Sequence, residues 1–378
     1  QAEDGIRDLV RSRGLGDVYK RQDLNWAIAG RNKNKLEALK SELNLDCDIF
    51  VADSDDYEAI KNFVKQTKVV LSAAGPFARY STKVVEACVE CKTHYTDITG
   101  ENHWVKGLID RFHEKAALDG TRIVPSCGYD SIPSDLGVYF SVTRSNQPVN
   151  HVTVYHSAKG GASGGTTETM FTMGPLPKEM RDPFLLNPKD SVSETQKRKS
   201  LDNFSVKPIP GTDAFSGMGL MAFANTRVVR RSSALFDLNQ KSYGPDFTFK
   251  ELGSYPSKAA ARITSFVLMS AFLVIATPLR YLVRPLLPKP GDGPDKEARD
   301  NGWFRGLFIA ELEDGSEKRF EIYGSGDPGY KSTSKMVCEA ALTLAFSDDL
   351  PFGNEFGGVL TSAVGLGDPL ISRLMKAG

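Results

Sequence analysis

A short apolar run that ends in a glycine and an arginine is the strongest nucleotide signal in this sequence. Residues 26–29 (WAIA) are followed by Gly30, Arg31 and Asn32, with two lysines close behind. In a dinucleotide-binding sheet the end of the second strand faces the adenosine ribose, where a carboxylate selects NAD and an arginine accommodates the 2′-phosphate of NADP. A guanidinium also matches phosphate geometry in a bidentate fork. The pattern predicts NADP as the cofactor, with NAD second; the alternative is an exposed basic loop.

Three further apolar runs end in small or polar residues that suit the same ligand. The residues expected to contact the cofactor each follow a predicted strand: Gly30, Arg31, Asn32, Asp53, Ala74, Gly75, Pro76, Phe77, Gly100 and Glu101. Glycine lets a cofactor approach the backbone closely, and Pro76 is expected to stop any immediate helix. Ligands of open sheets bind at the carboxyl ends of the strands, so these positions predict one crevice.

A polar stretch after a later strand supplies the candidates for contact with nicotinamide or substrate. Within residues 126–135 (SCGYDSIPSD) these candidates are Tyr129, Asp130 and Ser131. The alternative for the serines of this stretch is turn and helix-cap chemistry, and for Asp135 that is the role we expect.

His156 is the best catalytic histidine, because it leaves a predicted strand directly before the glycine-rich stretch 160–165. A lone histidine is nevertheless more often structural.

Cys88 and Cys91 form a CxxC without a second pair, so no metal site is expected. The sequence contains no nucleophile elbow, HExxH or Walker loop. An enzyme that transfers hydride needs none of these three motifs, because its cofactor supplies the reactive hydride.

Alternating apolar runs and amphipathic segments must position these residues. Strands are expected at 26–29, 46–51, 69–73, 94–98 and 122–125, and helices at 33–43, 55–67, 80–91 and 103–118. Strand–helix units in series are typical of a parallel, doubly wound sheet. We therefore predict an α/β fold with a Rossmann-type sheet.

The first 22 residues are expected not to belong to the gene. Residues 1–8 (QAEDGIRD) and 12–22 (SRGLGDVYKRQ) are what two short-read sequencing adapters encode in one frame, and such scars are excluded from fold reasoning. The alternative is a genuine charged tail. The sheet would then open at its second strand, without the first strand and its glycine-rich turn. We expect a chain of this kind to be unstable and inactive.

After residue 145 the pattern changes. Strands are expected at 151–158, 306–312 and 319–323, helices at 136–140, 166–173 and 331–345, a hairpin turn at 313–316, and a proline-studded excursion of low order at 175–213. We divide the chain into an incomplete Rossmann domain (23–145), an α+β substrate or dimerisation domain (146–327) and a C-terminal return to the first domain (328–378).

One apolar segment stands apart from both domains. Residues 263–277 carry no charge, and Arg280 and Arg284 follow shortly after. A spanning helix needs about 20 apolar residues, so this one is short. It suits an interfacial helix with basic anchors at a membrane or lipid-droplet surface. The alternatives are a buried core helix or a dimer interface.

The charge balance narrows the choice of partners. Lys and Arg together number 47, as do Asp and Glu, so no basic excess suggests nucleic acid. Five cysteines form no disulfide-framework spacing, which favours an intracellular location.

Several motifs together resemble the saccharopine dehydrogenase-like oxidoreductases, which include the trans-acting enoyl reductases of lipid biosynthesis. The resemblance covers nearly all of the chain after residue 22 and rests on AGR at 29–31, GPF at 75–77, DITGE at 97–101 and GYDSIPSDLG at 128–137. It implies a Rossmann domain, an α+β second domain and NAD(P)-linked reduction. Animal relatives associate with lipid droplets and membranes, which fits the segment 263–277.

The chain departs from this family at its N-terminal end. Family members begin with a strand and a GxSGFTG-like turn whose amides hold the pyrophosphate. Gly14 and Gly16 do not replace that turn, because a third glycine and the flanking apolar elements are missing. The resemblance transfers no catalytic roles.

We expect an NADP-dependent oxidoreductase that acts on a lipid-like enoyl or keto substrate at the cytoplasmic face of a membrane or lipid droplet, as a homodimer. One alternative is a non-catalytic lipid-surface protein that keeps the fold. Another is an amino-acid dehydrogenase of the saccharopine type, which needs several arginines in its cleft. Arg230 and Arg231 are the only obvious pair, and such pairs are usually solvated.

Overall fold

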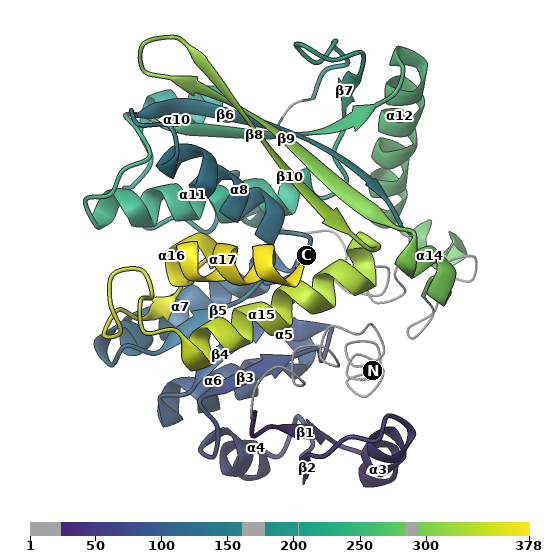
Figure 1. Cartoon of the computed structure of the whole chain (residues 1–378), viewed down its shortest axis with the longest axis vertical. Coiled ribbons are helices and arrows are strands. Elements are labelled where there is room, and N and C mark those ends of the chain that lie inside the picture. Colours follow the sequence, from purple (N-terminus) through teal and green to yellow (C-terminus); the bar gives the residue numbers. More distant parts are fainter. Residues whose placement is uncertain (1–23, 161–177, 203, 284–292) are drawn as a thin grey trace.

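The strands gather into two sheet regions in the computed structural model, which describes residues 24–160, 178–202, 204–283 and 293–378 (Figure 1). The lower region in that view alternates parallel strands with helices. The upper region is a twisted five-stranded sheet packed on helices. This arrangement confirms the predicted α/β class, with a Rossmann-type sheet and a second α+β part.

The parallel region follows the predicted alternation closely. Its elements are β1 (Ala27–Gly30), α3 (Lys33–Glu42), β2 (Asp48–Val51), α4 (Tyr57–Val64), β3 (Val69–Ser72), α5 (Phe77–Tyr80), α6 (Thr82–Cys91), β4 (His94–Asp97), α7 (Asn102–Leu118) and β5 (Arg122–Val124). The helices form because apolar residues recur on one face; Leu36 and Leu39 of α3, for example, are both buried.

The parallel strands pair in two groups. β3, β4 and β5 lie side by side, β11 (Gly358–Val359) adds to β5, and β1 pairs with β2 separately. In a complete doubly wound sheet of order 3-2-1-4-5-6, the first strand would lie between β1 and β3. Within the described residues no strand pairs at that position. The expectation for residues 1–22 lies outside the described part and stays a prediction.

One local prediction about this region is wrong. Pro76 does not stop an immediate helix, because α5 begins at Phe77, the very next residue. A proline at the start of a helix sacrifices no internal hydrogen bond, since the first amides of a helix have no partner within it.

The second sheet has the strand order β10-β9-β6-β8-β7. Its strands are β6 (Val149–Lys159), β7 (Phe215–Gly217), β8 (Thr248–Tyr255), β9 (Trp303–Leu312) and β10 (Glu317–Ser325). β9 and β10 form the predicted hairpin, in which Gly315 takes a positive φ of 82°. The predicted helix 166–173, and all but Gly160 of the stretch 160–165, lie outside the described residues.

Helices fill the space between the two sheets. They are α8 (Ile132–Thr143), α11 (Ala222–Leu238), α15 (Thr333–Phe346), α16 (Ser362–Gly365) and α17 (Gly367–Ala377) (Figure 1). Asp135 of α8 is buried and accepts hydrogen bonds from the Ser362 hydroxyl and the Ala363 amide, both at 2.8 Å. The expected capping role therefore exists, but it serves α16 and not the helix of Asp135 itself.

The two adjacent arginines of α11 are buried, so the expectation that they are solvated is wrong. Arg230 donates to the carbonyls of Pro183 and Ser200, at 2.9 and 3.0 Å, and to the Asp202 carboxylate. Arg231 donates to the carbonyl of Val359 at 2.7 Å. Carbonyls satisfy the guanidinium donors away from water.

These same bonds correct the prediction of low order at 175–213. The described part of that excursion includes the short helices η2 (Lys178–Arg181) and α10 (Glu194–Lys199). A capping box between Ser193 and Gln196 begins α10.

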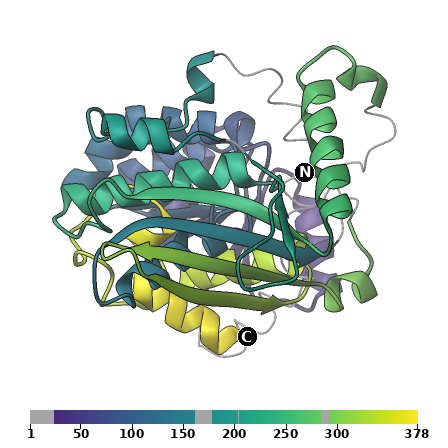
Figure 2. The same cartoon turned by 90° about the horizontal axis from the view of Figure 1, so that it is seen from above.

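The apolar helix α12 (Lys258–Ile275) runs along the edge of the molecule (Figure 2). It begins earlier than predicted, after a cap by the Ser257 hydroxyl on the Ala260 amide. Only Ala261 and Ser265 are buried, so the alternative of a core helix is wrong. Among the described residues it is the one helix long and apolar enough to cross a membrane, by length and composition alone. Two short helices, α13 (Arg280–Val283) and α14 (Lys296–Asp300), follow, while Arg284 lies outside the described residues.

Candidate functional site

The residues that follow β3, β4 and β5, here called the strand exits, meet at one edge of the parallel sheet. Ser72 of β3 is in register with Asp97 of β4, and the amide of Cys127 after β5 donates to the Asp97 carbonyl. The exits that carry Ala74, Gly75, Pro76, Phe77, Gly100 and Glu101 therefore lie at one edge of the sheet, and the cofactor crevice predicted there stays a prediction.

Glu101 holds the exits of β3 and β4 together. Its buried carboxylate accepts from the amides of Phe77, at 2.7 Å, and Ala78, at 3.1 Å. A carboxylate at a helix start satisfies amides that have no partner within the helix, so Glu101 caps α5. Phe77 itself is buried, with its ring centroid 5.9 Å from that of Trp104. In this structure both residues fix the start of α5 at the β3 exit.

Asp97 fixes the exits of β4 and β5 to one another. Its Oδ1 accepts from the amides of Thr99 and Ser126, both at 2.9 Å, and the side chain is fully buried. Burial raises the pKa of the Asp97 carboxyl to about 7. A carboxyl of this kind changes charge near neutral pH, next to the predicted nicotinamide position.

The predicted adenosine end lies on the separate pair β1 and β2. Gly30 ends β1, and its carbonyl accepts from the Ala52 amide at 3.0 Å. Arg31 follows with an exposed side chain. The side chains of Asn32 and Asp53 accept bonds from the amides of Lys35 and Asp55, which stabilise the start of α3 and a turn. Arg31 is thus an exposed cationic group at this exit.

Five polar side chains, here called the polar cluster, meet where α8 leaves the β5 exit. They are Ser131, Ser134, His156, Asn225 and Glu251, from α8 and its cap, β6, α11 and β8. The Ser134 hydroxyl lies 2.7 Å from Glu251 Oε2 and 2.9 Å from His156 Nε2. Asn225 Nδ2 donates to Glu251 Oε1 at 2.9 Å. The Ser131 hydroxyl donates to Asn225 Oδ1 at 3.3 Å.

The polar cluster adjoins the strand exits. The ring of Tyr129, in the β5 exit, meets the His156 ring edge to face at a centroid distance of 6.4 Å. Asn102, at the start of α7 after the β4 exit, donates to the carbonyl of Ala224, next to Asn225. The structure therefore brings together the candidates Tyr129, Ser131 and His156, which belong to different sheets.

Burial sets the charge states in this region. It raises the pKa of the Glu251 carboxyl to about 7 and that of Asp130 to about 6, while it lowers the pKa of His156 to about 4. Burial also raises the pKa of the Tyr129 hydroxyl, with help from Glu251. Perturbed groups in one place are typical of functional sites.

Sequence reasoning missed Asn225 and Glu251. Both come from segments that show no polar motif: one acid within an alternating strand resembles a solvent-facing residue. Ser134 stood within the predicted polar stretch but was not among the candidates, and turn or cap chemistry was its alternative role.

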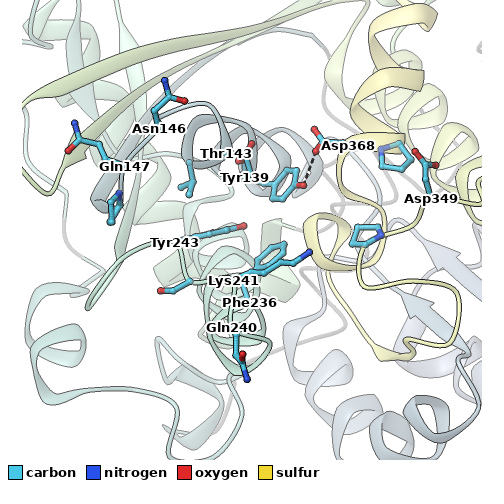
Figure 3. Close-up of a pocket in the computed structure, with 15 residues that line it drawn as sticks. Tyr139, Thr143, Asn146, Gln147, Phe236, Gln240, Lys241, Tyr243, Asp349 and Asp368 are labelled. Carbon is cyan, nitrogen blue, oxygen red and sulfur yellow. Dashed lines mark hydrogen bonds between the residues drawn. The ribbon is translucent and has the colours of Figure 1, made fainter.

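A pocket of about 610 Å³ lies at the other end of α8 (Figure 3). Its lining includes Tyr139, Phe236 and Lys241. Tyr139 stacks on Phe236 at a centroid distance of 5.6 Å and donates to Asp368. None of the predicted site residues lines this pocket, so it is not the candidate active site.

Comparison with known proteins agrees with the motifs. Residues 13–124 match the family model described as the saccharopine dehydrogenase NADP binding domain. The first part of this match falls within the segment attributed to adapters. A trans-acting enoyl reductase of Mycobacterium ulcerans is 32% identical, over 93% of this chain and 89% of the relative. The protein of the same name from Mycobacterium tuberculosis is 31% identical over the same shares.

A solved structure shares the fold. Apo saccharopine dehydrogenase (L-glutamate forming) from Saccharomyces cerevisiae superposes with a TM-score of 0.53 at 14% identity, covering 98% of this chain and 95% of the other. The similarity to the enoyl reductases extends over both sheets, well beyond the matched domain. The chain therefore belongs to the saccharopine dehydrogenase-like family of NAD(P) oxidoreductases, whose nucleotide-binding domain is an NADP-binding one.

Proposed function

We propose that the protein containing this chain uses NADPH to reduce a carbon–carbon double bond in a lipid-like enoyl substrate. The exposed Arg31 directly after β1, where a dinucleotide-binding sheet would meet the adenosine ribose, supports the choice of NADP. The choice of reaction rests on the relatives named trans-acting enoyl reductase.

In such a reduction the cofactor supplies a hydride, and the protein must place the double bond and deliver a proton. The exits of β3, β4 and β5 would hold the nicotinamide end. The polar cluster next to Tyr129 offers groups that hold a proton near neutral pH, Glu251 among them. These groups meet the need for general acid chemistry.

The amino-acid dehydrogenase alternative has less support. It needs arginines that bind substrate carboxylates in the cleft. Arg230 and Arg231 are instead buried and bonded to backbone carbonyls and Asp202. A substrate carboxylate would have to break those bonds.

A charge-reversing substitution at Arg31 tests the cofactor assignment on the full-length protein. We expect Arg31→Glu to weaken NADPH binding about tenfold or more, because a charge-assisted phosphate contact is worth about 1.5–3 kcal/mol. NADH affinity should change far less. Titration of each cofactor, followed by fluorescence, measures both constants.

Lys68→Glu is the matched control, because Lys68 is exposed at the opposite end of β3. Equal weakening by both variants, or equal loss of NADPH and NADH affinity, would contradict the assignment. Oxidation of NADPH in the presence of enoyl or keto lipids then tests the reaction.

We also propose that α12 attaches the protein to a lipid surface. Its outward side chains include Phe266, 74% exposed, and Leu273, 68% exposed. Lys258, Arg262 and Arg280 flank the apolar stretch, as suits an interfacial helix at anionic headgroups. Attachment would bring the enzyme to an apolar substrate.

Flotation with vesicles that contain anionic phospholipid measures this attachment. The double variant Phe266→Ser/Leu273→Ser should lower the bound fraction at least tenfold, since each buried apolar side chain contributes about 1.5–3 kcal/mol. Leu118→Ser/Met375→Ser, at residues 88% and 75% exposed on other helices, is the control. Unchanged vesicle binding, or a double variant that alters only dimerisation, would refute attachment through α12.

A further inference from the structure

A serine hydroxyl stands between a carboxyl group and an imidazole in the polar cluster. Ser134 Oγ lies within hydrogen-bond distance of Glu251 and of His156, whose Nε2 is itself 3.8 Å from Glu251 Oε2. The hydroxyl carries one proton and two lone pairs, so it can accept from one neighbour while it donates to the other. This is the geometry of a proton relay.

We propose that Glu251, Ser134 and His156 form such a relay, in which the Glu251 carboxyl holds the proton and His156 receives it. The inference deepens the proposed function, on which it rests for its purpose: a hydride that reaches one carbon must be matched by a proton at the next. Glu251 and Ser134 act through His156 and are positioning residues.

The transfer is a concerted shift of two protons. The O–H bond of Glu251 breaks while a new O–H bond forms on Ser134. The original O–H bond of Ser134 breaks while an N–H bond forms on His156 Nε2. The products are a carboxylate, an unchanged hydroxyl and an imidazolium, and no electrons are gained or lost.

The surroundings stabilise the carboxylate product and position the imidazole ring. The Asn225 amide donates to Glu251 Oε1, the oxygen not used by Ser134, and stabilises the carboxylate left behind. Gly306, opposite His156 on β9, leaves room for the ring, because a Cβ there would lie 3.2 Å from the imidazole Cε1. The Phe308 ring meets the imidazole edge to face at 6.2 Å. The ring is thereby held in place towards Ser134.

The resting position of the proton follows from burial. The pKa of Glu251 lies near 7 and that of His156 near 4, so the pair is mostly neutral between about pH 4 and pH 7. The other titratable groups that act on the carboxyl are Tyr129 and Asp130, both from the β5 exit. Asp130 raises the pKa of Glu251 further when it is ionised. Because such sites interact, they titrate as a coupled set.

Nitrogen-15 NMR of the histidine rings over about pH 5 to pH 8.5 tests the relay without cofactor or substrate. We expect the His156 ring signals to shift in a step near the pKa of Glu251, about 7. Glu251→Gln should remove that step, and Ser134→Ala should reduce it at least twofold. His151, which is bonded to Thr248 and Thr153, serves as the internal control and should respond to neither variant.

The relay would be overturned if the pH-dependent shift of the His156 ring signals persisted unchanged in both variants. It would also be overturned if that shift were missing from the unsubstituted protein. If Glu251→Gln does not fold, Ser134→Ala alone decides, because it removes a single oxygen. A matched variant outside the cluster, Glu311→Gln at an exposed position of β9, should leave the pH-dependent His156 step in place.

Turnover separates failure of the relay from failure of the proposed function. With an active full-length protein, Glu251→Gln and Ser134→Ala should lower kcat about 10²-fold or more with NADPH affinity unchanged. Loss of the NMR step with unchanged kcat would show that the relay does not serve catalysis. Absence of NADPH binding in the unsubstituted protein would refute the proposed function and leave the NMR test of the relay intact.

Discussion

Buried carboxyl groups gather around the strand exits, and their ionisation links single residues to stability. Burial raises the pKa of Asp97 and Glu251 to about 7 and that of Asp130 and Asp135 to about 6. Each pKa is higher in the folded than in the unfolded chain. The stability that such a group contributes is fully present below its unfolded pKa, near 4, and is lost as pH rises through its folded pKa.

Histidines act in the opposite direction over the same range. Burial lowers the pKa of His94, His151 and His156 to about 4, so their contribution is lost as pH falls from about 6.5 through that value. The pH profile of the whole chain is therefore a balance. A single substitution is needed to isolate one group.

Asp97→Asn isolates the fully buried carboxyl at the β4 exit. The amide keeps an acceptor for Thr99 and Ser126 but cannot ionise. Relative to the unsubstituted protein, the variant should gain about 2–3 kcal/mol of stability between about pH 5 and pH 8, at 1.36 kcal/mol per pKa unit. Urea unfolding at both pH values measures it. Asp213→Asn, at an exposed position, should show no such gain; parallel profiles for the two variants would contradict the prediction.

Residues of the site were predictable where local chemistry marks them. A glycine or polar residue directly after an apolar run marks a strand exit, as at Gly30, Gly75 and Gly100. Glu251 and Asn225 carry no such mark, because their partners are more than 20 residues away in the sequence. Only the tertiary fold shows that they meet Ser134.

At the scale of elements, periodicity predicted most helices and strands of the parallel region, because apolar residues recur at a fixed spacing on one face of each element. It failed where tertiary contacts decide. The 175–213 excursion looked unstructured because its few apolar residues show no periodicity, and it is held in part by hydrogen bonds from Arg227 and Arg230 of α11. The exposure of α12 was likewise open, since an apolar stretch suits a core and a surface helix equally.

Close contact between α8 and β9 requires a glycine at position 137. A Cβ there would lie 2.2 Å from Phe308 Cζ, on a buried ring beside His156. Gly137→Ala should therefore destabilise the protein by about 1–3 kcal/mol despite the better helix propensity of alanine. Gly107→Ala on α7, where nothing lies within 4 Å, should instead stabilise it by about 0.5–1 kcal/mol. Thermal unfolding measures the change in stability of both variants. A change of the same sign in both would contradict the close contact between α8 and β9.

Across the whole molecule, buried guanidinium groups join segments that are distant in sequence. Arg122 of β5 donates to the carbonyls of Gly365, Pro351 and Gly353 near the C-terminus. Arg231 of α11 donates to the carbonyls of Leu186 and Val359. The change of pattern after residue 145 predicted two sheets, but no local pattern indicates which side chains connect them. Such contacts join positions more than 40 residues apart, where periodicity carries no information.

Arg231 is the sharpest test of this long-range connection, because it is only 2% exposed and bonds to both the excursion and β11. Arg231→Met keeps the aliphatic stem but leaves two buried carbonyls without a donor, at about 1–3 kcal/mol each. We expect a loss of about 2–5 kcal/mol in urea unfolding and faster proteolysis within residues 178–202. Arg262→Met removes the same charge from the exposed face of α12 and should change stability by less than about 0.5 kcal/mol. A loss that leaves proteolysis of the excursion unchanged would show that the guanidinium does not hold that segment.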